Sequence, residues 1–567
     1  MSIHSIPSLS ATWTKQSYPN TQVARAQIAD SSLLTLATST IHSSVKPLNV
    51  GSQVGDVFLH VTQMPAKLES PEVTYGALGL IHVKAGQMQV WEQAPDNAIG
   101  HVMNRNTTGM TAQSRFAGLG AALLEHLSSN GTNYRQTVVN VDAPDSPQKI
   151  QDKASNALLA FQSLPSERVE LNIQTKSGAS VRIAIVDQSE RSSSGTGISV
   201  DIFVDGELSQ EEKSALKSLS SGFEKAVQGL MGDETLVDLQ GLTQFDSKVI
   251  AKLELKASVY GRDSQGLRYE KLSASFKADA NMREIQIKRP EGEVRINTDL
   301  RQPALWGSTE QKAHAVRQYL QRIDHAAERG HASRALIDMF KSTFMAMNTS
   351  YGSQETRSGI NGANATNSVK LSSDSGSWTE EDKSWLTGLA DFDATLAATP
   401  RASNPRKTQE LDKFQYTLNQ STEISGSTKS NRAVTQKQTA HLSAAYHKSL
   451  FSSAPPALDS TSESQNYYFH QIEDSSSTQV HLAYEKDVPV AATLTQTVSQ
   501  SQRVLKYEYN KLTEDRTTPV QQSKQMDLLP LLKQLKDQQE AHKITEDEKQ
   551  YVLKAWNSMV FQGLAAV

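Results

Sequence analysis

Hydrophobic and polar residues alternate along several stretches of the chain, and this period of two predicts β-strands. The stretch from Ile198 to Val204 alternates in this way and is followed by Asp205-Gly206, a pair that favours a turn. The same pattern predicts strands within residues 169–173, 181–185, 253–259, 272–276, 285–287 and 294–296. The first two flank a Lys-Ser-Gly turn, so we predict that they form a hairpin with one apolar face.

Apolar residues that recur every three or four positions predict helices. Such a face runs along residues 208–231, and others are predicted over 114–127 and 146–162. Two more helices are predicted within 309–348, with a break at Gly330. We expect the 146–162 and 208–231 helices to cover one face of a mostly antiparallel sheet, which is the arrangement of an α+β fold.

Three stretches share a pattern that is typical of helix N-termini: an apolar residue, Ser or Thr, two further positions, an acidic residue and Lys. These stretches are Leu208–Lys213, Trp378–Lys383 and Ile544–Lys549. In a capping box the hydroxyl accepts a hydrogen bond from the third helical amide, and the acidic side chain accepts one from the amide of the cap residue. Acidic residues in the first turn also complement the helix dipole. We therefore predict a capped helix at each of these starts.

Changes of pattern along the chain predict an order of regions. They are a disordered Ser/Thr-rich leader (1–55), a small β-rich region with a helix (56–133), an α+β domain (134–300), a helical hairpin (301–349), a linker (350–377), a short helix over 379–398 followed by a linker (378–410), a second antiparallel β region (411–512) and a C-terminal αα-hairpin (513–567). A chain of 567 residues is too long for one ordinary core, which agrees with several units.

The composition narrows the classes of protein. Lys and Arg number 57 against 61 Asp and Glu, so no bulk charge attracts nucleic acid, and we predict no nucleic-acid partner. The absence of cysteine excludes disulfides, thiolate metal sites and cysteine nucleophiles. No apolar run approaches the roughly 20 residues of a membrane helix, and no basic start with an apolar run marks a signal peptide. We predict no membrane insertion, and a protein that is cytoplasmic or exported without a classical signal peptide.

The strand, Asp-Gly turn, helix and further strands between about 130 and 300 give the chain a recognisable organisation. Together with the polar leader and the late polar strands, this organisation resembles that of uncharacterised proteins from Gram-negative bacteria. The resemblance implies a bacterial protein and no defined activity.

Residues 201–212 (DIFVDGELSQEE) fit an EF-hand calcium loop at several positions. Asp201 stands at position 1, Asp205 at position 5, glycine at position 6 and Glu212 at position 12, where the bidentate ligand belongs. Phe203 occupies position 3, which requires an oxygen ligand, and the incoming segment predicts a strand rather than a helix. Two interpretations stay open: a weak calcium site with Asp201, Asp205 and Glu212 as metal ligands, or a turn followed by a capped helix.

Two other motifs carry weaker chemical signals. Asp324, His325 and Glu328, with His331 after the glycine, place potential metal ligands near one helix end but lack an H-E-x-x-H pattern. The Gly-Leu-Gly at 118–120 resembles the start of a dinucleotide fingerprint, yet no buried strand is predicted before it and no βαβ series after it. We therefore predict no cofactor beyond the possible calcium ion.

No phosphate-binding G-x-x-x-x-G-K-[ST] motif and no G-x-S-x-G motif occurs in the chain. With its long polar strands, the chain is most typical of a non-enzymatic interaction or structural protein, whose protein partners the sequence does not identify. An exported effector or hydrolase with a dispersed site is an alternative, because a Ser–His–acid triad assembles in space rather than in sequence. A weak calcium-binding module at 201–212 is a third hypothesis.

Overall fold

The computed structural model describes residues 60–63, 87–142, 156, 167–192, 195–232, 237–349, 351, 378–426, 428, 430–541 and 544–562. The predicted leader, the 146–162 helix apart from residue 156, and nearly all of the predicted 350–377 linker lie outside these residues. Among the described residues, no helix combines the length and the apolar character that a membrane span requires.

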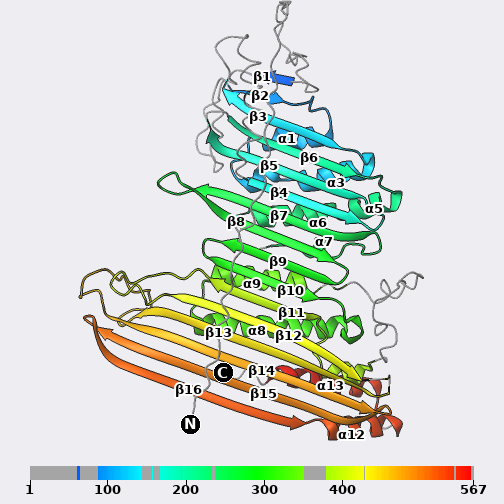
Figure 1. The fold of residues 1–567 in the computed structure, drawn as a ribbon, viewed down its shortest axis with the longest axis vertical. Coiled ribbons are helices and arrows are strands. Elements are labelled where there is room, and N and C mark those ends of the chain that lie inside the picture. The colour runs from blue at the N-terminus through cyan, green and yellow to red at the C-terminus, as the bar shows by residue number, and fades with distance from the viewer. Residues whose placement is uncertain are drawn as a thin grey trace, which may run out of the picture. The chain divides into compact units, whose positions relative to one another are not determined.

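The strands of the described residues form one sheet of 16, in which every neighbouring pair is antiparallel (Figure 1). Its order is β1-β2-β3-β6-β5-β4-β7, and from β7 to β16 each strand pairs with the next one in the chain. The strands are β1 His60–Gln63, β2 Gln87–Trp91, β3 Tyr134–Asp142, β4 Glu167–Thr175, β5 Ser180–Ser192, β6 Gly195–Asp205, β7 Ile250–Arg262, β8 Arg268–Asp279, β9 Met282–Arg289, β10 Gly292–Asp299, β11 Asp391–Ala398, β12 Lys413–Gly426, β13 Arg432–Ser449, β14 Tyr467–Glu485, β15 Val488–Glu508 and β16 Lys511–Asp527.

The predicted strands and their hairpin are confirmed. In the β4–β5 pair, Leu171 lies opposite Ile183 and both are buried, so the alternating apolar residues of the two strands share one face. The turn between them contains Gly178 at a positive φ of 104°, a conformation that glycine adopts without steric penalty. An antiparallel sheet combined with helices makes the fold α+β, as predicted.

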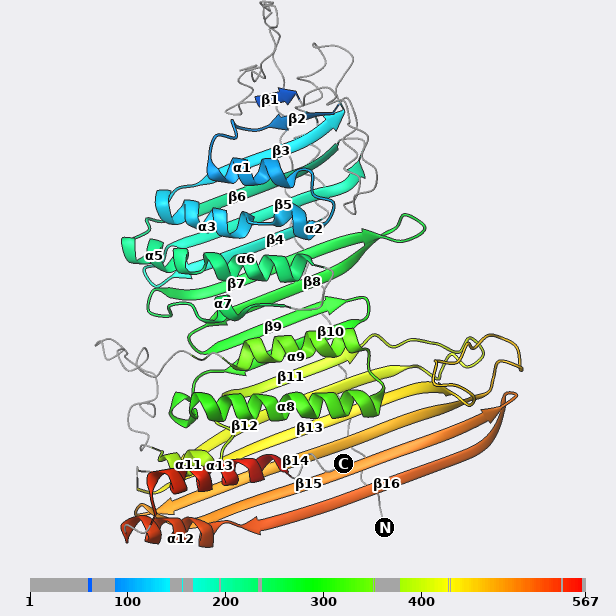
Figure 2. The same cartoon turned by 180° about the vertical axis from the view of Figure 1, so that it is seen from behind.

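The helices lie on one face of the sheet, in front of it in Figure 2. They are α1 Ala98–Asn106, α2 Ala112–Phe116, α3 Leu119–Asn130, α5 Gln210–Ser218, α6 Ser220–Met231, α7 Gln240–Thr243, η1 Pro303–Leu305, α8 Thr309–Gly330, α9 Arg334–Asn348, α11 Glu380–Ser384, α12 Leu529–Glu540 and α13 Glu546–Gln562. The segment predicted as one helix over 208–231 is two, α5 and α6, which meet at Leu219.

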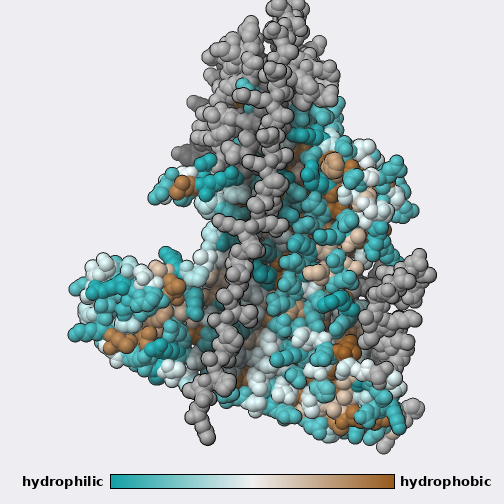
Figure 3. Space-filling view, viewed as in Figure 1, coloured by the Kyte–Doolittle hydropathy of each residue, from teal (hydrophilic) through white to brown (hydrophobic). Residues whose placement is uncertain are grey.

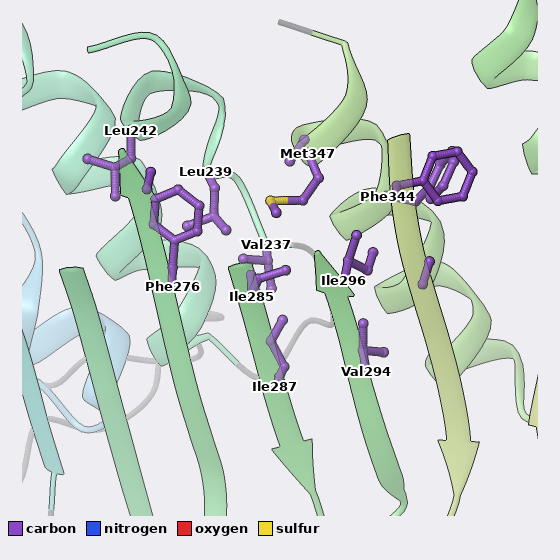
Figure 4. Close-up of a cluster of buried hydrophobic side chains, with 14 of the residues drawn as sticks. Val237, Leu239, Leu242, Phe276, Ile285, Ile287, Val294, Ile296, Phe344 and Met347 are labelled. Atoms are coloured by element: carbon purple, nitrogen blue, oxygen red, sulfur yellow. The ribbon is translucent and has the colours of Figure 1, made fainter. Parts of the chain in front are cut away.

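The main core lies between the helices and the sheet and forms one buried cluster that includes residues from Trp91 to Phe561. Figure 4 shows how α9 contributes: Met347 lies beside Ile285 of β9 and Ile296 of β10, and Phe344 lies over β11, where its ring centroid is 5.1 Å from that of Phe392. Since each of these side chains is almost fully buried, removal of apolar surface from water stabilises this contact between layers.

The helical hairpin predicted within 309–348 is formed by α8 and α9 and ends its first helix at Gly330, as expected. His331, at φ 57°, adopts the left-handed conformation that ends the helix. A Cβ atom on Gly330 would lie 2.6 Å from the ring of Phe414, so this glycine also permits close packing of α8 on β12.

The helix predicted over 379–398 is wrong beyond its first turn. α11 ends at Ser384, Gly388 adopts a φ of 77°, and residues 391–398 form β11. Phe392, Ala394 and Leu396 are buried at every second position, because β11 pairs with both β10 and β12. The sheet of the predicted 134–300 domain therefore continues directly into the predicted 411–512 region.

The C-terminal region predicted as an αα-hairpin over 513–567 begins instead with β16, and its two helices, α12 and α13, follow at 529 and 546.

All three predicted helix starts are confirmed as reciprocal caps. The hydroxyls of Ser209, Thr379 and Thr545 accept from the amides of Glu212, Asp382 and Glu548, and these carboxylates accept from the amides of the cap residues.

Candidate functional site

The residues of the predicted calcium loop have protein partners in the structure. Asp201 lies on β6 and its carboxylate is 3.2 Å from the guanidinium of Arg182, which also faces the ring of Phe203. Glu212 accepts hydrogen bonds from the amide of Ser209 at 2.8 Å and from the hydroxyl of Ser177 at 2.7 Å. Both carboxylate oxygens of Glu212 are thus engaged.

These contacts favour the interpretation as a turn and capped helix. Burial opposes ionisation of Glu212, but the hydrogen bonds from Ser177 and Ser209 outweigh it and lower its pKa. Within the part of the chain that the structure describes, no group of three or more His, Asp and Glu side chains is placed to bind a metal ion. Calcium binding stays a prediction, and calorimetric titration of wild type and Glu212→Ala tests it: the absence of heat at millimolar calcium would contradict it.

Removing the cap hydroxyl tests the other interpretation. We expect Ser209→Ala to lower the free energy of unfolding by about 1 kcal/mol, because the amide of Glu212 loses its acceptor. Urea unfolding followed by circular dichroism measures the change. Ser220→Ala serves as the control, since its exposed hydroxyl only contacts a carbonyl of the preceding turn, and a loss as large in Ser220→Ala as in Ser209→Ala would contradict the capping role.

The other sequence motifs do not assemble into sites either. Asp324 is 2.7 Å from Lys341, and the ring of His331 stacks on Tyr446, so these two potential metal ligands have other roles. At the predicted dinucleotide-like glycines, the carboxylate of Glu224 accepts from the amides of Gly118 and Ala121 at the start of α3. A protein carboxylate therefore occupies the position that a phosphate takes in a dinucleotide site.

The long strands β12 to β16 assemble a polar surface on the face opposite the helices. On these strands Leu418, Val480 and Leu494 are buried toward the helices, so the residues next to them point to the other face. The pairing register places polar residues in three cross-strand rows, which we call the polar grid. They are Ser421, Lys437, Gln479, Thr495 and Gln525; Asn419, Thr439, Ser477, Thr497 and Ser523; and Thr417, His441, Ser475, Ser499 and Gln521.

The polar grid is hollowed at its centre. A depression of about 420 Å³ is lined by Thr439, Ser475, Ser477, Thr497 and Ser499, among others. Serine and threonine are short, so the longer side chains of the neighbouring rows form its rim. Directly paired side chains on adjacent strands lie about 5 Å apart. The surface therefore presents a regular array of hydroxyl and amide groups around a shallow hollow.

The grid differs in charge from the rest of this face. On the shorter strands the same face carries ion pairs, such as Arg168 with Glu170 and Arg295 with Glu293. Among the 15 grid residues only Lys437 and His441 can carry a charge. Pale, weakly polar residues accordingly gather over the long strands in the lower part of Figure 3. Recognition at the grid would depend on hydrogen bonds and shape more than on net charge.

Next to the grid, loop residues 399–412 and 450–466 meet the same face of the sheet, and a second small core forms there. It comprises Ala445, Tyr467, Phe469, Leu505 and Tyr507, with Leu458 of the second loop packed on it. These apolar residues continue the odd-numbered rows of β13 to β15 toward the strand ends. These two loops and the second core therefore form the boundary of the grid on one side.

A buried charge cluster fastens the first loop to this second core. The side chain of His447 is 1% exposed, and its Nδ1 lies 2.7 Å from Asp412 and its Nε2 3.3 Å from Glu410. The hydroxyl of Tyr467 donates to Glu410 at 2.7 Å and accepts from the amide of Asn404 at 3.0 Å. Both ring nitrogens of His447 face carboxylates, so the imidazolium, which donates from both nitrogens, fits this position.

The cluster shifts the pKa values of its members. Burial opposes protonation of His447, but its hydrogen bonds to Asp412 and Glu410 outweigh burial and raise its pKa. Burial likewise opposes ionisation of Glu410 and Asp412, yet the hydrogen bonds from His447 lower the pKa of each. Protonated His447 contributes its full stability to the fold below its unfolded pKa of 6.5, and this contribution is lost as the pH rises through its folded pKa. The two carboxylates contribute stability when ionised, and their contribution is lost as the pH falls through their folded pKa values. The cluster is therefore strongest in weakly acidic solution.

A spin label on the loops should report this pH dependence. The chain has no cysteine, so Phe451→Cys, at an exposed position four residues beyond His447, provides a single labelling site. We expect the label to become more mobile as the pH rises above the ordinary histidine value of 6.5 and His447 loses its proton, and His447→Gln to abolish the change. Electron paramagnetic resonance measures the mobility. A label at exposed Met110 is the control, and an equal response there, or none at 451, would contradict the expectation.

No protein-family model, no curated protein and no solved structure matches the chain.

Proposed function

We propose that this protein is a non-enzymatic interaction protein that binds a protein partner through the polar grid. The observation that carries the proposal is the contrast between the two faces of the long strands. On β12 to β15 one face is buried under helices, whereas the other face, together with β16, presents three rows of hydroxyl and amide groups around a hollow of about 420 Å³. Long loops and strand faces that lack a structural role are frequent binding surfaces.

The composition of the grid supports a protein as the partner. Nucleic acids and anionic membranes are bound by clustered Lys and Arg, and the grid contains a single lysine and no arginine. Ser, Thr, Asn and Gln can both donate and accept hydrogen bonds, which suits the neutral polar groups of a protein surface.

The edge of the sheet is less suited to binding than its face. Within the described residues β16 pairs only with β15, so its outer edge is open to another strand. Yet Pro519 lies in the middle of β16, and charged residues such as Glu514, Arg516 and Lys524 flank it. Proline and charges on an edge strand oppose the addition of further strands.

Photocrosslinking tests the proposal. Thr497→Cys places a unique thiol at the centre of the grid, and Tyr551→Cys places one at an exposed position of α13 as the matched control. Each variant carries a benzophenone and is returned to extract of its native cell. We expect a discrete crosslinked protein at 497 that is absent at 551 and that an excess of unlabelled wild type displaces.

A second set of variants separates the grid from the rest of the protein. An excess of unlabelled Ser477→Arg should fail to displace the crosslinked partner, because the larger charged side chain fills the hollow. An excess of Lys256→Met, on the charged part of the same face, should displace it as well as wild type does. Equal crosslinking at 497 and 551, or displacement by Ser477→Arg, would refute the grid as the binding surface.

A further inference from the structure

A small cavity lies beneath α8, on the helix-covered face of the long strands. Its volume is about 80 Å³, and its lining includes Arg322, His325 and Arg329 from successive turns of α8 and Asp474 from β14. One water molecule needs roughly 15 Å³ of such space, so the cavity has room for a group of several heavy atoms. It lies on the opposite face of the sheet from the polar grid, although Ser475 of the grid also contributes to its lining.

Arg322 is the unusual residue of this cavity. It is 7% exposed, and within the described residues no carboxylate forms an ion pair with it. One of its nitrogens donates to the side chain of Gln438 at 3.3 Å, and another has no hydrogen-bond partner. Its guanidinium also lies near the rings of Tyr319 and Phe561, 5.1 and 5.2 Å from their centroids.

A buried guanidinium without an anion is costly, because desolvation removes water that stabilised its charge. Burial accordingly lowers the pKa of Arg322. Buried arginines are normally paired with a carboxylate or phosphate, whose planar or tetrahedral oxygens match the fork of the guanidinium. The rings of Tyr319 and Phe561 and the amide of Gln438 compensate the charge only in part.

The carboxylate that lines this cavity is already paired with another cation. Asp474 accepts two hydrogen bonds from Arg329, so its charge is already matched. Counting Arg322, Arg329 and Asp474, the cavity carries one excess positive charge before any contribution from His325. A bound anion would neutralise this excess charge and leave the ion pair of Arg329 and Asp474 intact.

We propose that the cavity beneath α8 binds a small oxyanion, inorganic phosphate or a short carboxylate, with Arg322 as its main electrostatic partner. The anion would supply the negative charge that Arg322 lacks, and His325 stands at the same lining as a second donor. The site is a property of the helix-covered face and does not depend on the function proposed for the grid.

Calorimetric titration of the full chain tests the site, with inorganic phosphate and acetate as separate ligands at constant ionic strength. Wild type should bind at least one of them, and the two titrations decide which source of the oxyanion fits. Arg322→Met should weaken binding roughly 10- to 100-fold through loss of charge-assisted hydrogen bonds. Arg317→Met removes an exposed charge from the same helix and should bind like wild type.

A second variant blocks the cavity while it keeps the arginine. Ala326→Leu places extra methyl groups at a lining position, and we expect it to weaken binding as Arg322→Met does, so the test survives if Arg322→Met fails to fold. Absence of heat with both ligands in wild type would overturn the proposal. Unchanged affinity in Ala326→Leu or in a folded Arg322→Met, or an equal loss in Arg317→Met, would overturn it too.

Discussion

Replacing Arg115 by methionine is expected to lower the free energy of unfolding by about 3–5 kcal/mol. Arg115 and Asp187 are 3% and 0% exposed, and the Nε of the arginine donates to the carboxylate at 2.6 Å. The same guanidinium donates to the carbonyls of Thr107 and Gly197, which joins the loop after α1 to β6. Methionine would fill much of the volume but would remove the cation that balances a buried carboxylate and the donor that serves two carbonyls.

Two further variants show whether the loss comes from the uncompensated charge. Adding Asp187→Asn to Arg115→Met should recover part of the lost stability, because the carboxylate that needs a partner is then neutral. Arg135→Met removes a half-exposed partner of Glu92 and should change stability by less than about 1 kcal/mol. Urea unfolding of the four proteins measures the differences. A loss below about 1 kcal/mol in Arg115→Met would show that water or a local rearrangement compensates Asp187.

Elements whose signals are local can be predicted from the sequence. The reciprocal caps at Ser209, Thr379 and Thr545 need only residues within one turn, and the hairpin of β4 and β5 needs only alternation and a glycine turn. β11 escapes such a prediction because its strand character depends on pairing with β10 and β12 on both sides. Propensity within eight residues is weak compared with that tertiary context.

The polar grid and the buried ion pairs cannot be predicted from short stretches of sequence, because they bring together residues that are far apart in the chain. A slip of one residue in any pairing would turn a grid row toward the helices, so the grid depends on the register of five strands at once. Arg115 and Asp187 are 72 positions apart. Arg322 becomes unusual only because, in the part of the chain that the structure describes, no acid forms an ion pair with it. The sequence does show long polar strands, and that composition alone favours an interaction protein.

The calcium hypothesis shows the opposite case: the residues have the spacing of a calcium loop in the sequence, but in the fold their side chains contact other protein groups. Asp201 and Glu212 are correctly spaced for an EF-hand loop, but Asp201 lies within β6 and its carboxylate pairs with Arg182 of β5. Glu212 turns back to its own cap and to Ser177. Phe203 at position 3, visible in the sequence, is the residue that already favoured a strand.

Glu167→Gln should raise the stability of the protein at and above neutral pH. The carboxyl of Glu167 lies in the same buried cluster as Asp187 and Arg115 at the start of β4. Burial, together with a hydrogen bond to Asp187 and its negative charge, raises the pKa of Glu167 from 4.5 to about 8, although Arg115 opposes the change. The folded protein therefore keeps a proton that the unfolded chain has released.

The expected gain in stability of Glu167→Gln follows from this difference in bound protons. An acid whose pKa is raised on folding destabilises the folded state as the pH rises from the unfolded value to the folded one, by about 1.4 kcal/mol per pH unit. Between pH 4.5 and about pH 8 the accumulated loss is of order 4 kcal/mol. Glutamine has nearly the same shape, does not ionise, and its amide can donate to Asp187 as the protonated carboxyl does. The variant should thus match wild type near pH 4.5 and exceed it increasingly toward pH 8.

Unfolding by urea at a series of pH values separates this effect from a general change in packing. Glu170→Gln is the matched control on the same strand, because its hydrogen bonds to Arg168 and Asn172 lower its pKa despite partial burial. Its replacement should remove stability above the unfolded value rather than add it. A stability difference between Glu167→Gln and wild type that is constant with pH would show that Glu167 is ionised in the folded state, and would imply that Arg115 serves both carboxylates of the cluster.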